Sequence, residues 1–348
     1  MRGFGLFRLP YAAACTLVGG DVLSLTAISQ LSDRHGFVVA PFAISEETPL
    51  LLISPEFVEH YAHPADIHEL PEMSSLAALD YTHEGDERSD YHIDFANFHA
   101  RLRKGEFQKL VLSRSIAVKR DDDETALSLF QKACACYPRM MIALTYTPQS
   151  GLWLAATPEI LLGGEEGSWQ TMALAGTMKY EGTQRWSDKN IQEQRYVATY
   201  IIRQLERFTS QYTEEGPRTT RAGHLAHLRS DFRFSLSSDT LLGDVLQALH
   251  PTPAVCGLPK EDAYRFILHQ EHHQRRYYSG FMGPLQLSLS AAEATHLFVN
   301  LRCMQIFSDG YRLYAGGGLL PDSVEEMEWQ ETETKLDTMR NLFIRHSS

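Results

Sequence analysis

The sequence is poor in cysteine, has no long apolar run and carries fewer basic than acidic side chains. Its five cysteines in 348 residues are few and odd in number, so a disulfide framework is not expected, and we predict reduced thiols in a cytoplasmic protein. No run of about 18 apolar residues occurs, so no membrane-spanning helix is expected. The formal net charge of −12 argues against a nucleic-acid-binding surface, and an anionic substrate would need a local cation or a metal ion.

The composition is otherwise ordinary for a globular protein, with 43% apolar and 22% charged residues. Residues 1–88 show short strand-like runs separated by turns, and the charged stretch 84–90 is either a linker or a surface loop. Amphipathic helices are expected at 92–104, 123–136, 187–208, 240–249 and 260–273. A chain of this length could form two domains or one large unit, and many strands mixed with a few long helices predict an α+β fold.

The last helix carries charge on the face that should point inward. Ser323 followed three residues later by Glu326 is a capping-box pattern, which predicts a helix start just after Pro321. The positions at i, i+3 and i+4 spacing on this helix are Glu328, Glu331, Thr332, Lys335, Leu336, Met339, Leu342 and Phe343. Desolvating the carboxylates of this stripe is costly unless a cation or polar ligand meets them. The alternative is a helix end that turns out of the core into water.

A second carboxylate heads the buried face of the helix expected at 187–208. Extending the apolar stripe of that helix back by one turn reaches Glu193. Together with the two glutamates of the last helix it offers oxygen ligands without an accompanying Cys/His zinc pattern, and such ligands favour Mg²⁺. Spacing alone leaves open whether these carboxylates hold a metal or form ion pairs with Lys335 or Arg195.

An anion-binding site is predicted near the C-terminus. Arg302 lies within an otherwise apolar strand pattern at 296–307, and an arginine can hold a carboxylate through two hydrogen bonds. A glycine cluster is expected to end a strand-like run as a loop beside Arg302; its members are Gly316, Gly317 and Gly318. Their backbone N–H groups could add donors, although turns also use glycine.

An acid/base pair is a further candidate. Lys109 begins a strand pattern at 109–118, and Glu159 follows a proline at the end of another strand. A buried lysine can act as a base and a held carboxyl as an acid, although each residue taken alone is also consistent with a surface position. A histidine group with zinc-like spacing is better interpreted as a polar helix surface, because no further ligand motif accompanies it; its members are His269, His272 and His273.

Nine segments taken together resemble the chorismate-utilising enzymes, and most closely the isochorismate synthases. In chain order they are KLVLSR (109–114), AATPEILL (155–162), LAGT (174–177), KNIQEQ (189–194), HLRS (227–230), LHPTPAVCG (249–257), RRYYSGFMG (275–283), LFVNLRC (297–303) and YAGGGLL with EWQETETK (314–335). One such segment would be weak, but the ordered series is specific. It covers about residues 90–345, whereas residues 1–88 match loosely.

The resemblance implies one domain over 1–348, a large layered sandwich of antiparallel sheets flanked by helices. Residues 1–88 would form its N-terminal part and residues 89–348 a chorismate-binding core, with the site in the cleft between the layers. It implies Mg²⁺ bound by Glu193 and Glu331, with Glu328 close by. The groups that would hold the substrate carboxylates are Thr177, Arg302, the backbone of Gly316, Gly317 and Gly318, and Lys335.

The same resemblance implies the chemistry. Lys109 would activate water for attack at C2 of chorismate, and Glu159 would protonate the C4 hydroxyl as it leaves. Lys109 and Ala175 both differ from the residues typical of amine-using members, so no glutaminase subunit is expected. Gln194 and Gln274 depart from the family pattern. The alternatives are a salicylate synthase, which would go on to eliminate pyruvate, and a catalytically silent chorismate-binding protein. Neither menaquinone nor siderophore biosynthesis is favoured.

Overall fold

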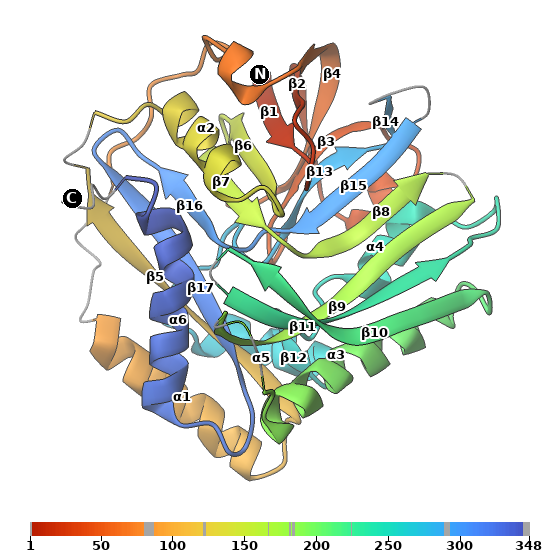
Figure 1. Cartoon of the computed structure of the whole chain (residues 1–348), viewed down its shortest axis with the longest axis vertical. Coiled ribbons are helices and arrows are strands. Elements are labelled where there is room, and N and C mark those ends of the chain that lie inside the picture. The colour runs from red at the N-terminus through yellow and green to blue at the C-terminus, as the bar shows by residue number, and fades with distance from the viewer. Residues whose placement is uncertain are drawn as a thin grey trace.

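The computed structural model describes residues 2–79, 87–120, 123–165, 167–180, 182, 185–223, 225–288 and 293–343. Within these ranges the chain forms 17 strands and six α-helices, which confirms the predicted α+β class (Figure 1). In the described residues, none of the helices is long and apolar enough to cross a membrane.

The strands pair antiparallel in one long series that falls into two halves. The first half runs in the order β12 (Gly257–Leu258), β5 (Lys109–Lys119), β17 (Gly310–Leu319), β16 (Cys303–Ile306), β7 (Gly151–Thr157), β6 (Met141–Thr147), β1 (Arg2–Arg8) and β2 (Cys15–Leu25). The second half runs in the order β4 (Leu50–Tyr61), β3 (Gly36–Ala40), β13 (Phe281–Leu285), β15 (Glu293–Val299), β8 (Ile160–Glu165), β9 (Ser168–Lys179), β11 (Leu225–Phe234) and β10 (Tyr212–Ala222). Strand β14 (Leu287–Ser288) pairs with β15, and the pairing of β2 with β4 joins the halves.

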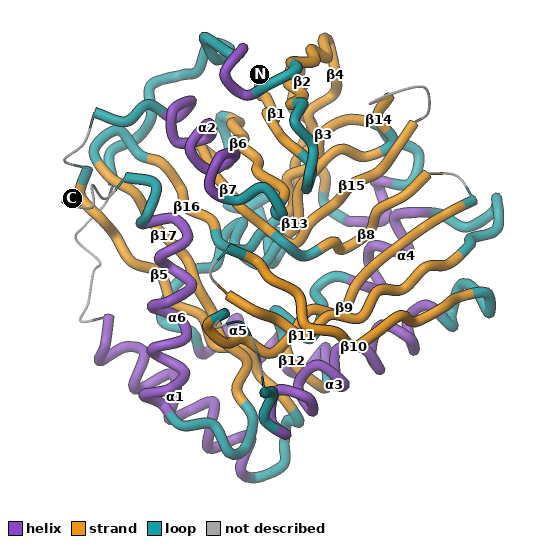
Figure 2. The backbone as a smooth tube through the Cα atoms, in the orientation of Figure 1, coloured by secondary structure: helices purple, strands orange, loops and turns teal. Residues whose placement is uncertain are grey.

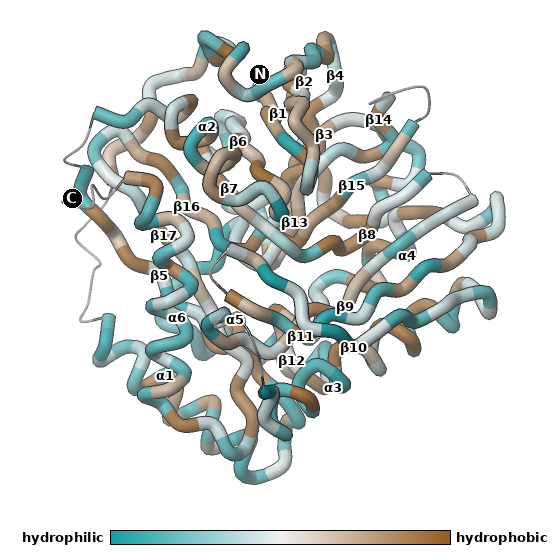
Figure 3. The backbone as a smooth tube through the Cα atoms, viewed as in Figure 1, coloured by the Kyte–Doolittle hydropathy of each residue, from teal (hydrophilic) through white to brown (hydrophobic). Residues whose placement is uncertain are grey.

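The two halves pack face to face through a shared apolar layer. Phe7 of β1 lies 5.5 Å, ring centre to ring centre, from Phe37 of β3. Buried Trp153 and Tyr314 from the first half and Phe298 from the second belong to the same cluster. This is the predicted layered sandwich, and Figure 3 shows apolar stretches along its central strands.

Helices cover the outer faces of the sandwich (Figure 2). The helices are α1 (Glu87–Arg103), α2 (Ala126–Cys136), α3 (Asp188–Leu205), α4 (Leu242–Leu249), α5 (Lys260–Gln270) and α6 (Glu325–Arg340), with short 3-10 turns at Ile28–Leu31 and Pro64–Asp66. Helices α2 and α6 share an apolar cluster with the first half, and α3 and α4 share one with the second half. Helices α1 and α5 pack against β5 and β17.

Several boundaries differ from the sequence expectations. The capping box at Ser323 is wrong: α6 begins at Glu325 without a side-chain cap, because the Ser323 hydroxyl instead accepts the backbone N–H of Leu320 at 3.0 Å. The expected helix at 123–136 begins only at Ala126. The charged stretch 84–90 is helical from Glu87 onward, and its first three residues lie outside the described residues.

Candidate active site

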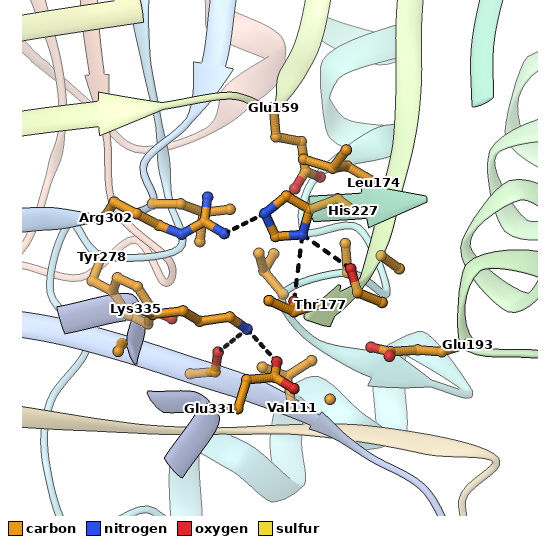
Figure 4. Close-up of a pocket in the computed structure, with 18 residues that line it drawn as sticks. Val111, Glu159, Leu174, Thr177, Glu193, His227, Tyr278, Arg302, Glu331 and Lys335 are labelled. Carbon is orange, nitrogen blue, oxygen red and sulfur yellow. Dashed lines mark hydrogen bonds and ion pairs between the residues drawn. The ribbon is translucent and has the colours of Figure 1, made fainter. Parts of the chain in front are cut away.

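A cavity opens where the chain crosses between the two halves of the sandwich (Figure 4). Its charged and polar lining residues are Glu159, Thr177, Glu193, His227, Tyr278, Arg302, Glu331 and Lys335, together with the backbone at Gly176, Gly316 and Gly318. Three predicted site residues, Lys109, Gly317 and Glu328, are not among the lining residues but contact or lie close to those that are. The structure therefore brings together all the residues that the sequence placed in one site.

Two crossovers, which are segments that connect one half of the sandwich to the other, position Glu159 and Arg302. Glu159 lies between the end of β7 in one half and the start of β8 in the other, and Arg302 lies between β15 and β16. Backbone hydrogen bonds tie the crossovers together: Val299 N–H donates to the Glu159 carbonyl at 2.9 Å, and Ala156 N–H donates to the Arg302 carbonyl at 3.0 Å. Both side chains are thereby held in the gap between the halves.

The expectation that Arg302 lies inside a continuous strand is wrong. The predicted strand at 296–307 breaks between β15 and β16, and Arg302 adopts a left-handed backbone conformation with φ of 45°. A non-glycine residue there is strained, and such strain is typical of functional sites. Regular strand alternation does not decide where this side chain points.

Glu159 is buried in surroundings that favour its protonated form. It is 1% exposed, and the Thr252 hydroxyl donates to its Oε1 at 3.5 Å. Burial raises the pKa of Glu159 to about 7, against a smaller opposing effect of the cations Lys109 and Arg302. At neutral pH this carboxyl can therefore either carry or release a proton.

His227 orients Arg302 and was not identified as a site residue from the sequence. Arg302 Nη2 donates to His227 Nε2 at 2.9 Å, while His227 Nδ1 donates to the Gly176 carbonyl at 3.0 Å. Burial, followed by the positive charges of Arg302 and Lys335, holds the pKa of His227 well below its usual value, so the ring is neutral. Among the described residues, buried Arg302 Nη1 has no hydrogen-bond partner, which leaves a donor for an anionic ligand.

A bulge in β9 makes the His227 contact possible. His227 pairs with Thr177 and the next residue, Leu228, pairs with Ala175, so Gly176 is the extra residue. Its φ of 73° favours glycine. Residues 218–222 and 225–233, which include several basic side chains, lie in two paired strands, β10 and β11. A strand assignment there, with His227 inside the HLRS segment, is the signal that could have revealed this residue.

The glycine cluster lies within a strand and does not form the expected loop. Gly316, Gly317 and Gly318 belong to β17 and pair with Ser113, Leu112 and Val111 of β5. The N–H group of Ser113 donates to Glu271, and that of Val111 donates to the Cys256 carbonyl, so neither donates to β17. In an antiparallel pair of this kind both residues direct their backbone polar groups away from each other. The N–H groups of Gly316 and Gly318 therefore point away from β5. The Gly316 carbonyl, on that side, accepts from Lys335 Nζ at 2.8 Å.

Glycine is required here for close approach. A Cβ at position 318 would lie 2.1 Å from Glu193 Oε1, and a Cβ at position 316 would lie 2.7 Å from the Tyr278 hydroxyl. At position 317 a Cβ would lie 3.7 Å from Glu328 Oε2 and 3.8 Å from Glu331 Oε1, which are ordinary contacts. The bare strand thus lets carboxylates from α3 and α6 approach the same three residues.

Each of the three carboxylates pairs with a lysine. Lys109 Nζ lies 2.9 Å from Glu193 Oε1, and the lysine is fully buried, which excludes the surface position that the sequence left open. Lys335 Nζ donates to Glu331 Oε1 at 2.7 Å, and Lys189 pairs with Glu328. The sequence left open an ion pair with Lys335, which forms.

The pKa values of the two α6 carboxylates, Glu328 and Glu331, are shifted in opposite directions. Burial raises the pKa of Glu328, and the neighbouring Glu331 raises it further. Burial also disfavours the charged form of Glu331, but the Lys335 ammonium outweighs this and lowers the pKa of Glu331. Carboxylate oxygens are the donors that Mg²⁺ prefers, so the donor chemistry fits this ion, which usually takes one or two protein carboxylates together with water and a substrate anion. The described ranges contain no preformed group of three His, Cys, Asp or Glu side chains within reach of one metal ion.

His269 lies on the exposed surface of α5, as expected, but α5 ends at Gln270, so His272 and His273 lie outside the helix. His272 Nδ1 pairs with Asp94 Oδ1 at 2.5 Å, and His273 Nε2 bonds to the Ser113 hydroxyl at 2.9 Å. The two rings therefore bond to different elements, α1 and β5.

The antiparallel sandwich and its cleft of arginine, lysine and carboxylate side chains define an enzyme-like site for an anionic ligand. The chain belongs to the chorismate binding enzyme family, whose model matches residues 29–344. It is 30% identical over 256 residues to isochorismate synthase MenF of Escherichia coli (strain K12), covering 69% of this chain and 57% of that protein. It is 26% identical over 342 residues to isochorismate synthase DhbC of Bacillus subtilis (strain 168), covering 93% of this chain and 85% of that protein.

Solved structures confirm the fold. A 2,3-dihydroxybenzoate-specific isochorismate synthase, DhbC, from Bacillus anthracis superposes with a TM-score of 0.81 at 22% identity, covering 97% of this chain and 95% of that one. MenF of Escherichia coli superposes with a TM-score of 0.80 at 21% identity, covering 98% and 88%. The sequence matches to the Escherichia coli MenF and EntC proteins span 57% and 63% of those relatives, less than two thirds of their length.

Proposed function

We propose that the chain converts chorismate to isochorismate in a Mg²⁺-dependent reaction. The observation that carries this proposal is Glu159, a buried carboxyl with a pKa of about 7, beside an Arg302 donor that has no partner in the described part of the chain. Its isochorismate synthase relatives and the series of family segments support the same reaction. The continuous strand series, which joins strands from both ends of the chain, supports a single domain.

Substrate binding would use the donors that face the cavity. Chorismate is a dianion, and this acidic protein needs local donors to hold it. Arg302 Nη1, Lys335 and the Thr177 hydroxyl would hold one or both carboxylates, assisted by the N–H groups of Gly316 and Gly318 on the open edge of β17, with Gly317 between them. His227 would keep the guanidinium of Arg302 in one orientation.

The proton transfers would use the acid and the base. Hydroxyl is a poor leaving group, so Glu159 would donate its proton to the C4 oxygen as the C–O bond breaks. Lys109 would take a proton from the water that attacks C2. Transfers of this kind contribute on the order of 10²- to 10⁴-fold to a rate. Ala175 lines the cavity and offers no amine nucleophile, which also favours water chemistry.

The carboxylates of α3 and α6 would hold the metal ion. Glu193 and Glu331 would be its ligands, with Glu328 close by, and bound Mg²⁺ would supply positive charge to neutralise a substrate carboxylate. The lysine partners Lys109, Lys189 and Lys335 currently balance these negative charges. Lys335 would then be available to the substrate.

The product formed from chorismate tests this proposal. The purified chain is incubated with chorismate and Mg²⁺, and the products are separated by chromatography with pyruvate measured in parallel. Isochorismate without pyruvate is expected. Salicylate with an equal amount of pyruvate would establish a salicylate synthase, and chorismate bound without turnover would establish a silent binding protein.

A further inference from the structure

Strand β5 presents side chains with different tasks on its two faces. Lys109 pairs with Glu193 of α3, whereas Arg114, at the opposite phase of the strand, bonds to Thr332 of α6. Nothing in the proposed chemistry uses Arg114, although its side chain is only 5% exposed and its charge must be compensated. Burial lowers the pKa of Arg114, against the raising effect of the Glu333 and Glu87 carboxylates.

Arg114 contacts the turn of α6 that carries the proposed metal ligands. Its Nε donates to the Thr332 hydroxyl at 2.8 Å, and its guanidinium carbon lies 3.7 Å from the centre of the Trp329 ring. Trp329 directly follows Glu328 in the chain, and Thr332 directly follows Glu331. The Thr332 hydroxyl in turn donates to the Trp329 carbonyl at 2.7 Å, so one arginine fixes the side chain next to each carboxylate.

The first turns of α6 are also held by contacts from other elements. The N-cap residue, Val324, has no polar side chain to cap the helix, although the three glutamates of the first turn suit the positive end of the helix dipole. Tyr91 of α1 packs edge-on against Trp329 at 5.1 Å, ring centre to ring centre, and completes the pocket around that ring. Only a planar guanidinium can stack on the ring and reach Thr332 and Glu333 at once, and lysine cannot reproduce this geometry.

We propose that Arg114 is a positioning residue that sets the height and rotation of α6, and thereby the places of Glu328 and Glu331. This role of Arg114 depends on one part of the proposed function, namely that Glu328 and Glu331 lie at a site that binds a divalent cation. Oxygen ligands of Mg²⁺ must lie at about 2.0–2.1 Å in near-octahedral geometry, so a small shift of the helix weakens binding. Residues that orient metal ligands typically account for about 10- to 100-fold in metal affinity.

A matched pair of variants tests the role. Arg88 lies over the same Trp329 ring at 4.6 Å, but its side chain is 39% exposed. The native chain, Arg114→Lys and Arg88→Lys are titrated with Mn²⁺, a paramagnetic substitute for Mg²⁺, and free Mn²⁺ is measured by electron paramagnetic resonance. Arg114→Lys is expected to raise the Kd for Mn²⁺ about tenfold or more, and Arg88→Lys less than twofold. Equal Kd values for Arg114→Lys and the native chain would overturn the proposal.

Further measurements separate position from folding and from the reaction itself. If Arg114→Lys does not fold, Thr332→Val serves in its place, because it removes the hydrogen bond from Arg114 with little change of side-chain shape. The proposal then requires that Thr332→Val raises the Kd for Mn²⁺. The pH profile of turnover is expected to keep its shape in both variants, because neither touches Glu159. If the native chain binds Mn²⁺ but does not convert chorismate, the proposed function fails while the Mn²⁺ comparison still decides the role of Arg114.

Discussion

Glu159 and Glu331 are the same residue type in one cavity, yet their surroundings drive them in opposite directions. Within the described part of the chain, Glu159 accepts its side-chain hydrogen bond from a hydroxyl, that of Thr252, and burial raises its pKa to about 7. Glu331 accepts a hydrogen bond from the Lys335 ammonium at 2.7 Å, and its pKa is lowered even though burial opposes this. The Lys335 ammonium therefore keeps Glu331 charged, whereas the cations near Glu159 do not outweigh the effect of burial on its pKa.

This contrast assigns the two ends of the cavity to different tasks. The end near the crossovers holds Glu159, a carboxyl that can give up a proton near neutral pH, whereas the α6 end holds Glu331, whose lowered pKa keeps it ionised and suited to a cation. Titratable groups whose pKa values are pushed apart are a mark of acid/base sites. The following variants break or sharpen the contrast, beginning with the largest expected effect.

Glu159→Gln removes the proposed acid while keeping a similar shape. Turnover of chorismate is expected to fall by about 10²- to 10⁴-fold, because an amide cannot protonate the leaving hydroxyl. The measurement is kcat with chorismate at saturating Mg²⁺. Glu165→Gln, at the exposed far end of the same strand β8, is the control and should leave kcat unchanged. A kcat within threefold of the native value in Glu159→Gln would remove the acid assignment.

Glu331→Ala removes the proposed ligand at the other end of the cavity. Activity is expected to fall at least on the order of 100-fold and to lose its response to Mg²⁺, since even partners of metal ligands account for 10- to 100-fold. The rate is followed over a Mg²⁺ titration. Glu326→Ala, on the exposed side of the same helix, should keep the native response. Full Mg²⁺ stimulation in Glu331→Ala would exclude this residue as a ligand.

The raised pKa of Glu159 predicts how rate and stability depend on pH. A proton donor with a pKa of about 7 loses its proton above that pH, so turnover should decline on the alkaline side. The pKa of Glu159 in the folded state lies above its ordinary value of 4.5, so the folded state binds the proton more tightly than the unfolded state. This favours folding below about pH 4.5, and the advantage is lost as pH rises to about 7.

Urea unfolding of the native chain and of Glu159→Gln at several pH values measures this contribution. Relative to the variant, the free energy of unfolding of the native chain should fall by about 3 kcal/mol between pH 4.5 and 8, at 1.36 kcal/mol per unit of pKa. A difference between the two proteins that stays constant with pH would show that the pKa of Glu159 is not raised by folding.

Substitutions at two neighbouring glycines of β17 are expected to have the smallest effects on turnover. Gly318→Ala would place a methyl group 2.1 Å from Glu193 Oε1, so this carboxylate must move and turnover should fall about tenfold or more. Gly317→Ala makes ordinary contacts of 3.7 and 3.8 Å, and its turnover should stay within about twofold. The readout is kcat/KM for chorismate. Equal losses in both variants would contradict the close approach of Glu193 to the strand.

Predictions based on the spacing of apolar residues along a single helix were confirmed in the structure. The helical stripes placed Glu193 and Glu328 on inward faces, because side-chain direction follows the local period. Predictions about where strands end failed. Arg302 lies in a break between strands, and the glycines at 316–318 continue a strand that was expected to end there.

The sequence by itself determined the α+β class, the inward faces of the main helices and strands, and the set of residue types that a dianionic ligand requires. Hydrophobic period and residue chemistry are local properties that each segment carries with it. Only the tertiary structure decided that two crossovers bring Glu159 and Arg302 together and that a bulge at Gly176 directs His227 to that arginine. It also decided that each carboxylate meets a lysine from another turn or element, since such contacts depend on how distant segments pack.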